Sequence, residues 1–559
     1  MASKTFARLL ALICILIPPL MVVQLVLQYP RNIPVWDQYR SVPVALAAHD
    51  GTLTLTDIFS PSWGHFTVFT HLTTALATIT TGWNLNVEVY VGFALALVNF
   101  TLLLRIARDT LPDVPPLLLA VVLSVLVFYL RQNLNWIVGY NNAWQFANLF
   151  LLLTVWVLLV TDAGWSGVLL ALLSATASAF SVGAGLFTFT TGLLLILFTA
   201  RWRWIKAIVW LIGAGAVLSV YAVSGALASD AETAPVTLPL LAGAVKFMLL
   251  SVGLVFDPFA TEDTALVVAG VAFSVLLVNA FYLSRYARNN HAVAVWLSLA
   301  AYTVGVLFLA GVARLTLYGM PQGYSVAFWS TWYTTPAIAL WSAVLLTGTA
   351  VLDHMRRTRR RLLYALLNVV VLIIVVAGYA PATRYAYNQF FSQLYRSQTG
   401  QCGWRYIFVQ APLPECPLEP DDYTEKQFNQ LAARQLAIYA QITPVNIIGA
   451  AAPTVIVQSE SAWFNSHTRD FLLAGVPTQN TIHLFPADDP ALTRIPVPPE
   501  PAPALPVLEM ESVWVISPVS HPRPVVNELE AQGYMPVTVK TYEGVVLIEQ
   551  FHRVQTDKN

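Results

Sequence analysis

Charged residues are scarce in this sequence. Only 11% of its 559 residues are Asp, Glu, Lys or Arg, whereas soluble proteins usually carry about 25%. Thirty basic residues balance thirty acidic ones, so the chain also lacks the basic surplus that nucleic-acid binding requires. A soluble enzyme and a nucleic-acid-binding protein are therefore excluded.

Cysteine and glycine-rich motifs are equally sparse. The chain has three cysteines and no CxxC pair or Cys/His cluster with metal-binding spacing, which argues against structural zinc. It has no GxGxxG or Walker-type loop in its C-terminal part, so nucleotide binding there lacks a motif.

Apolar residues are abundant, at 57% of the chain. Apolar runs of 16 to 22 residues recur over residues 1–380, near the roughly 20 residues that a transmembrane helix needs. Eleven spans are predicted, at 9–29, 86–104, 115–131, 146–161, 165–182, 184–200, 207–224, 264–283, 291–312, 333–352 and 362–380. Two weaker stretches, 66–82 and 238–256, are predicted to lie at the membrane surface or to re-enter it.

The distribution of Lys and Arg predicts the orientation of these spans, because cytoplasmic loops retain positive charge. With the N-terminus inside, the inner segments hold 14 basic residues and the outer loops hold five. The odd number of spans then places the tail outside the cytoplasm. The first span has no small-x-small cleavage site after it, so we expect it to be a retained anchor in the cytoplasmic membrane.

Residues 381–559 are predicted to form a small extracytoplasmic α/β domain, separate from the membrane domain at 1–380. Strands are expected at 454–457, 481–484, 512–516, 537–539 and 545–548, and helices at 425–439, 466–474 and 523–532. Cys402 and Cys416 lie in this exported tail, where oxidation is permitted, and a disulfide could join them.

The first outer loop, which extends from residue 30 towards 85, holds the main candidate for chemistry. Asp37 follows Trp36 near the membrane, where partial desolvation would raise its pKa and suit it to act as a general base. Two simpler readings stay open: Asp37 pairs with Arg40, or it caps a helix.

Together these features resemble the GT-C glycosyltransferases, in particular the dolichyl-phosphate-mannose mannosyltransferase-like group (family 39-like). The resemblance rests on an entry helix, the Trp36-Asp37 pair, a His65-containing segment before an interfacial helix, and the motif STWYTTP at 330–336. It implies a polytopic helical enzyme that moves a sugar from a polyprenyl-phosphate donor to an extracytoplasmic lipid, glycan or protein.

The resemblance also implies roles for individual residues. Asp37 would deprotonate the acceptor hydroxyl and the reaction would invert the anomeric carbon. A second carboxyl group is dispensable because phosphate, unlike the alcohol released by a glycosidase, leaves as a stable anion. Arg40, His65 or Arg314 would stabilise that phosphate. Each of the three also has a structural interpretation. Arg40 could pair with Asp37, His65 could start a helix, and Arg314 could anchor a span end at the lipid headgroups.

Several aromatic side chains accompany these residues. Trp36, Trp63 and Tyr333 could contact sugar or lipid. Trp and Tyr also form the interfacial belt of membrane proteins, which we expect to account for most of the aromatic residues of the outer loops, among them Trp136, Tyr140, Trp144, Trp329 and Trp332.

The chain departs from the pattern at two positions. Gln38 stands where many relatives have a second acid, and Trp332 stands where an arginine is expected.

A second acid or a divalent metal ligand could come from Asp257, Glu262 and Asp263. The sequence therefore leaves open whether a divalent cation is a cofactor.

Glu88 begins the second span, where snorkelling or helix capping is expected.

Three alternatives remain besides an active transferase. A secondary transporter or flippase for a lipid-linked or small hydrophobic substrate would favour ionisable residues at bilayer depth and related broken helices in two halves, and the sequence shows few of either. A receptor-like protein would need fewer spans. A catalytically degenerate family member would explain the two departures.

Overall fold

The computed structural model describes residues 2–28, 32, 34, 36–62, 64–226, 237–256, 261–329, 331–358, 362–396, 425–437, 454–459, 482–486, 511–518, 524–542 and 546–554. Contacts divide the chain into two units. The bundle unit comprises Met1–Tyr29, Leu53–Thr74 and Val87–Asn388, and the loop-and-tail unit comprises Pro30–Thr52, Ala75–Asn86 and Gln389–Asn559. The predicted domain boundary at 380/381 falls within one helix, α17 (Leu362–Arg396).

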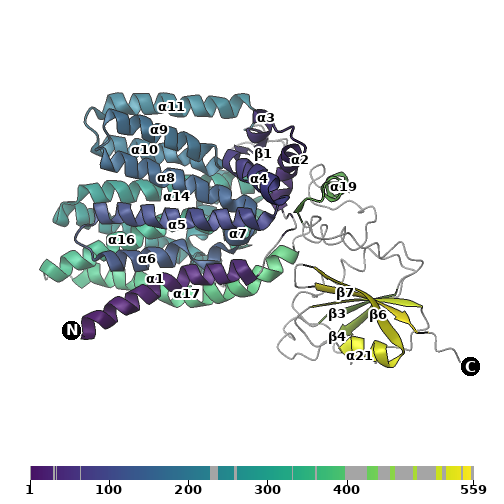
Figure 1. The fold of residues 1–559 in the computed structure, drawn as a ribbon. Coiled ribbons are helices and arrows are strands. Elements are labelled where there is room, and N and C mark those ends of the chain that lie inside the picture. The colour runs from purple at the N-terminus through teal and green to yellow at the C-terminus, as the bar shows by residue number, and fades with distance from the viewer. Residues whose placement is uncertain are drawn as a thin grey trace, which may run out of the picture. The chain divides into compact units, whose positions relative to one another are not determined.

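Long helices that run side by side make up the bundle unit (Figure 1). They are α1 (Ala2–Gln28), α5 (Leu85–Thr110), α6 (Pro116–Val127), α8 (Asn142–Val160), α9 (Trp165–Ala179), α10 (Phe187–Thr199), α11 (Arg203–Val223), α12 (Leu238–Gly253), α13 (Glu262–Tyr282), α14 (Asn290–Tyr318), α15 (Met320–Trp329), α16 (Thr334–Thr358) and α17. Short elements join them: α3 (Leu55–Ile58), β1 (Pro61–Ser62), β2 (His65–Phe66) and α4 (Val68–Thr81).

The protein is a multi-pass membrane protein. Within the described residues, nine helices are long and apolar enough to cross a membrane, and they correspond to nine of the eleven predicted spans. The other two, predicted at 165–182 and 184–200, are shorter: 15 residues in α9 and 13 in α10. The chain reverses between α9 and α10 so tightly that a Cβ at Gly185 would overlap the carbonyl oxygen of Ser178.

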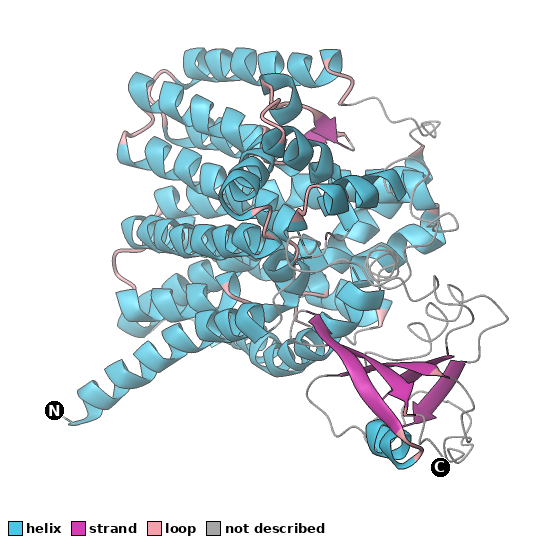
Figure 2. Ribbon diagram, turned by 45° about the vertical axis from the view of Figure 1, so that its right-hand side comes forward, coloured by secondary structure: helices cyan, strands magenta, loops and turns pink. Residues whose placement is uncertain are grey.

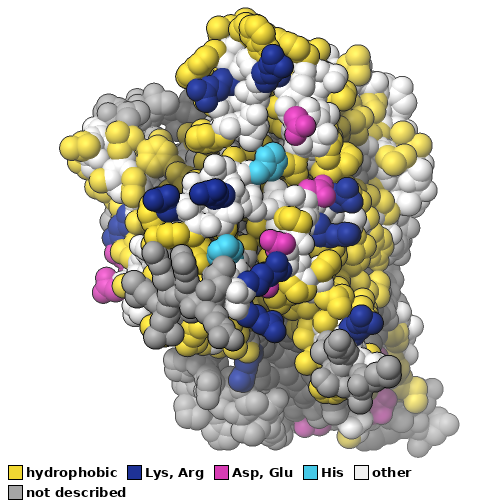
Figure 3. Space-filling model, turned by 90° about the vertical axis from the view of Figure 1, so that its left-hand side faces the viewer, with side chains coloured by type: hydrophobic (Ala, Val, Ile, Leu, Met, Phe, Trp, Pro, Cys, Tyr) yellow, Lys and Arg dark blue, Asp and Glu magenta, His cyan; other side chains and the backbone are white. Residues whose placement is uncertain are grey.

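The loops predicted to be cytoplasmic gather at one end of the bundle unit. Three side chains hydrogen-bond to backbone carbonyls between these loops: Asn289 to Thr110 at 2.9 Å, Lys206 to Ala163 at 2.7 Å and Arg357 to Asp113 at 2.7 Å. Figure 3 faces this end, where Lys and Arg side chains outnumber Asp and Glu. Which side of the membrane this end faces stays a prediction.

The opposite end contains an irregular stretch between α6 and α8. It consists of η2 (Leu130–Gln132), α7 (Asn133–Ile137) and η3 (Gly139–Asn141), and every residue from 128 to 140 is buried. Broken helices occur at membrane depth only where protein covers them. Trp136 is 2% exposed and Tyr140 is 5% exposed, so assigning these two rings to a lipid-facing belt was wrong.

Buried polar side chains fasten this stretch to the STWYTTP motif, which forms η6 (Thr331–Tyr333) and the start of α16. The Thr331 hydroxyl donates to Asn133 Oδ1. The Thr335 hydroxyl donates to Gln132 Oε1 and accepts from Asn135 Nδ2. We call these five residues the polar junction. It joins segments that lie about 200 positions apart in the sequence.

The C-terminal part of the loop-and-tail unit contains a five-stranded sheet with the order β4-β3-β5-β7-β6 (Figure 2). Its strands are β3 (Thr454–Ser459), β4 (Ile482–Pro486), β5 (Ser512–Pro518), β6 (Tyr534–Tyr542) and β7 (Val546–Arg553). β3 pairs in parallel with β4 and β5, whereas β5, β7 and β6 pair antiparallel.

One helix, α21 (Pro524–Ala531), shares the core of this sheet. Its Val526 and Leu529 are buried with Val513, Val515, Tyr534 and Phe551. Val513 and Val515 alternate along β5, so both face the same side of the sheet. The predicted strands and α/β character of the tail are confirmed, whereas the expected helix at 466–474, Cys402 and Cys416 lie outside the described residues.

The polar junction predicts a stability effect. Replacing Asn135, which is 4% exposed, with Ala removes its bond to Thr335 and leaves a small void. We expect Asn135→Ala to lower the free energy of unfolding by about 1–3 kcal/mol. Thr176→Ala is the control, because the Thr176 hydroxyl donates to the Leu172 carbonyl of its own helix; it should cost under about 0.5 kcal/mol. Denaturant unfolding in detergent measures both, and equal losses would contradict the role of the junction.

Candidate functional site

Asp37 and Arg40 lie on one turn of η1 (Trp36–Ser41) in the loop-and-tail unit. The Arg40 Nε donates to Asp37 Oδ1 at 3.4 Å. The Asp37 side chain is 59% exposed and that of Arg40 is 11% exposed. The pairing alternative is therefore observed, while the expected desolvation of Asp37 is not. The side chain of Trp36 and all of Trp63 lie outside the described residues.

The residues next to Asp37 hold this turn firmly. Tyr39 is 0% exposed and Ser41 is 1% exposed, and η1 continues directly into α2 (Val42–His49). Gln38, at the position where a second acid is expected, is 3% exposed. A neutral amide costs less to bury there than a carboxylate would. Asp37 is thus an accessible carboxylate on a well-packed turn.

Arg314 and Tyr333 are the two predicted site residues that the structure brings together within the bundle unit. The Arg314 Nε on α14 donates to the Tyr333 hydroxyl at 2.8 Å. Tyr333 is 5% exposed, and its ring meets Phe247 of α12 edge to face at 5.5 Å. Because η6 carries both Tyr333 and Thr331, the polar junction fixes the tyrosine and the tyrosine orients the guanidinium.

His65 lies in a short hairpin formed by β1 and β2, where it pairs with Ser62. It is half-buried and packs against Gly183, where a Cβ would lie 3.0 Å from the Cβ of His65. Helix α4 begins at Val68, so the alternative reading of His65 as a helix-start residue was wrong.

Helix α4 has a buried polar face that the sequence interpretation missed. His71 is 0% exposed. Its Nδ1 lies 3.0 Å from the Ile58 carbonyl oxygen and its Nε2 lies 3.1 Å from the Thr67 hydroxyl. A carbonyl can only accept, so Nδ1 carries the proton and Nε2 accepts from Thr67. Burial lowers the pKa of His71, and the hydrogen bond to the Ile58 carbonyl partly opposes this shift.

The same face of α4 binds neighbouring helices. The Thr70 hydroxyl donates to Asn142 at 2.7 Å, and the Thr74 hydroxyl donates to Glu88 Oε1 at 2.6 Å. Glu88 is 0% exposed, so the expectation that it snorkels to the membrane surface was wrong. The helical spacing of Thr67, Thr70, His71 and Thr74 is a sequence signal that could have revealed this face.

One of the acidic residues considered as metal ligands has another partner. Glu262 forms an ion pair with Lys246, and the Lys246 ammonium lies 4.5 Å from the centre of the Tyr324 ring. Within the described residues, no group of three or more His, Cys, Asp or Glu side chains could hold a metal ion. Asp257 lies outside the described residues.

No protein-family model and no curated protein sequence matches this chain. It is similar to solved structures of the Archaeoglobus fulgidus oligosaccharyltransferase. With the form in complex with Zn and sulfate it shares 14% identity and a TM-score of 0.33, over 84% of this chain and 62% of that chain. The first of these relatives is therefore matched over less than two thirds of its length.

Two further structures of that oligosaccharyltransferase match over 75% of their length. The apo form gives 12% identity and a TM-score of 0.38 over 98% of this chain. The form named AglB, in complex with an inhibitory peptide and a dolichol-phosphate, gives 12% identity and a TM-score of 0.37 over 99% of this chain. Because all three TM-scores are below 0.5, the likeness establishes neither fold family nor activity.

The buried His71 predicts a pH dependence of stability. The unfolded chain binds a proton near the ordinary pKa of 6.5, whereas the folded chain binds it only at a lower pH. The contribution of His71 to the free energy of unfolding is therefore complete above pH 6.5 and declines as the pH falls below that value.

The variant His71→Gln removes the titrating group, so its stability should change less between pH 7 and pH 5 than that of the unmodified protein. Unfolding in detergent at several pH values measures the slope. The exposed His291 offers a matched control, and His291→Gln should keep the original slope. A full slope in His71→Gln would show that the titration lies elsewhere.

Proposed function

We propose that this protein is a GT-C-type membrane glycosyltransferase that moves a sugar from a polyprenyl-phosphate donor to an extracytoplasmic acceptor. The observation that carries the proposal is the 2.8 Å bond between Arg314 and Tyr333. The sequence predicts a phosphate contact for Arg314 and a sugar or lipid contact for Tyr333, and the two side chains meet at the end of the bundle where the spans are irregular.

Arg314 is suited to the phosphate of the donor. Its half-buried guanidinium is oriented through Nε by a tyrosine that is itself held in place. A guanidinium binds phosphate through charge-assisted hydrogen bonds, and a preoriented cation stabilises charge that develops on a leaving group. His65 remains a proposed secondary contact for the same phosphate.

Asp37 is proposed as the general base for the acceptor. Its carboxylate takes the proton of the acceptor hydroxyl, whose oxygen attacks the anomeric carbon opposite the phosphate. The bond from that carbon to the phosphate oxygen breaks with both electrons, so phosphate leaves as an anion and the carbon is inverted. The contact at 3.4 Å supports a role for Arg40 in orienting this carboxylate.

The base assignment is tested with purified protein in vesicles and a radiolabelled polyprenyl-phosphate hexose. We expect Asp37→Asn to lower kcat about 10²- to 10⁴-fold, the usual contribution of a general base, without changing stability. Asp113→Asn is the control, because Asp113 is 78% exposed and lies in a loop that is predicted to be cytoplasmic. An Asp37→Asn enzyme with full activity would remove the assignment.

The donor-site assignment makes a graded prediction. We expect Arg314→Gln to lower kcat/KM for the donor about 10- to 100-fold, as the loss of a charge-assisted bond implies, and Tyr333→Phe about three- to tenfold. Tyr318→Phe is the matched control, since Tyr318 is 39% exposed near the end of the same helix.

Equal effects of Tyr318→Phe and Tyr333→Phe would contradict the donor-site assignment. Movement of unmodified donor across the vesicle membrane, without sugar transfer, would favour the transporter reading instead.

A further inference from the structure

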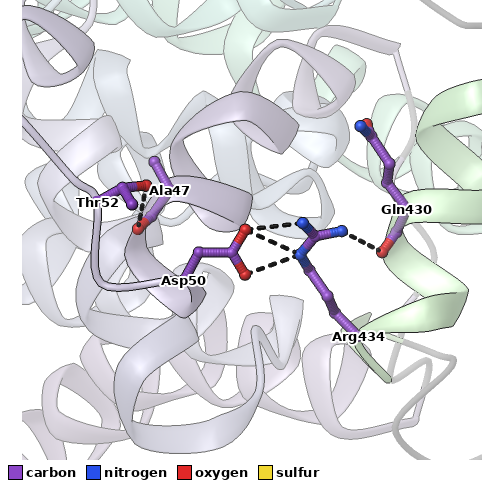
Figure 4. A network of polar contacts seen from close by, with 5 residues as sticks. All are labelled: Ala47, Asp50, Thr52, Gln430 and Arg434. Atoms are coloured by element: carbon purple, nitrogen blue, oxygen red, sulfur yellow. Dashed lines mark hydrogen bonds and ion pairs between the residues drawn. The ribbon is translucent and has the colours of Figure 1, made fainter.

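A bidentate ion pair joins two distant segments of the loop-and-tail unit (Figure 4). Asp50 follows α2, and Arg434 follows α19 (Glu425–Ala433), 384 positions later. The Arg434 Nε lies 2.8 Å from Asp50 Oδ1 and the Arg434 Nη2 lies 2.7 Å from Oδ2. Two parallel bonds fix the relative orientation of the groups as well as their distance.

The position of Asp50 is unfavourable for α2 itself. It is the C-cap residue of that helix, where the backbone carbonyls place partial negative charge and a carboxylate is repelled. Arg434 supplies the compensating cation, and its hydrogen bond holds the pKa of Asp50 below the ordinary value. The acid is therefore explained by its partner Arg434, which follows α19, and not by the formation of α2.

Two further contacts hold α19 and the residues that follow it. The backbone N–H of Ala437 donates to the carbonyl of Gly82 at 2.9 Å, and α19 packs against α2. Leu431, Leu436 and Ala437 are between 0% and 1% exposed. The start of the tail is thus attached to the first outer loop by charge, by backbone and by apolar contact.

This attachment acts on the segment that carries Asp37. η1 and α2 form one continuous helical stretch from Trp36 to His49, so a displacement of its C-terminal end at Asp50 also moves its N-terminal turn. We propose that the Asp50–Arg434 pair is a clamp through which the tail positions Asp37. Asp50 and Arg434 are positioning residues, and the kinetic consequence rests on the proposed function of Asp37.

The clamp should affect position more than stability. The side chains of Asp50 and Arg434 are 36% and 30% exposed, and ion pairs with such access to water contribute little to the free energy of unfolding. Loss of the pair leaves the backbone bond of Ala437 and the packing of α19 against α2, which fix the orientation of α2 less closely. We therefore expect altered motion of residues 36–49 in a protein that remains folded.

The test uses the full chain in vesicles and compares Asp50→Asn, Arg434→Gln and the exchanged pair Asp50→Arg with Arg434→Asp. Each single variant should lower kcat about three- to tenfold with an unchanged KM for the donor, as expected for a modest coupling. The exchanged pair should regain at least half of the original kcat. Asp109→Asn is the control, because Asp109 forms a comparable exposed pair with Arg105 at 3.1 Å.

Amide hydrogen exchange of residues 36–49 supplies a readout that does not depend on catalysis. Exchange there should accelerate in both single variants, and slow again in the exchanged pair. If exchange responds in this way but the unmodified protein transfers no sugar, the clamp stands and the proposed function fails. If exchange at 36–49 is unchanged, or the exchanged pair restores neither exchange nor kcat in an active enzyme, the clamp is wrong.

Discussion

The need to satisfy buried polar groups where α6 gives way to irregular backbone governs the arrangement of the bundle unit. An amide buried without a partner costs several kcal/mol in an apolar medium, about 4–8 by transfer measurements. The stretch at 130–142 places its amides against two different partners. Thr331 and Thr335 bond to Asn133 and Gln132 on one side, and Thr70 of α4 bonds to Asn142 on the other. An interruption in one span thereby fixes two segments that are remote in sequence.

The candidate donor site inherits its geometry from this constraint. Arginine has a long, flexible side chain, and holding it in one orientation costs conformational entropy. The bond from Tyr333 removes that freedom at Arg314, but only because Tyr333 lies between two threonines of the polar junction. A site of this kind needs supporting residues that are themselves immobile. The chemistry proposed for Arg314 thus depends on Asn133 and Gln132, neither of which needs to touch substrate.

The sequence predicts those features that depend on local pattern. The nine long spans follow from uninterrupted apolar runs, and the tail strands follow from alternating Val and Ile residues. Pairing between distant side chains has no such local signal, so the bond between Thr331 and Asn133, 198 positions apart, could not be predicted. The prediction that Glu88 snorkels was wrong for another reason. The polar face of α4, which includes its partner Thr74, was predictable from helical spacing, but α4 was interpreted as a surface helix.

The scarcity of charge gives the remaining charges outside the loops predicted to be cytoplasmic a definite structural role. Three of them, Arg40, Lys246 and Arg434, each pair with an acid among the described residues, and Arg314 pairs with a tyrosine hydroxyl. Such pairs contribute modestly to stability because most of these groups retain contact with water. Their effect is directional: the Arg40 pair fixes one turn of η1, and the others join different elements at one orientation. In a chain dominated by apolar contacts, which have no preferred direction, these few polar contacts determine how the candidate site residues are oriented.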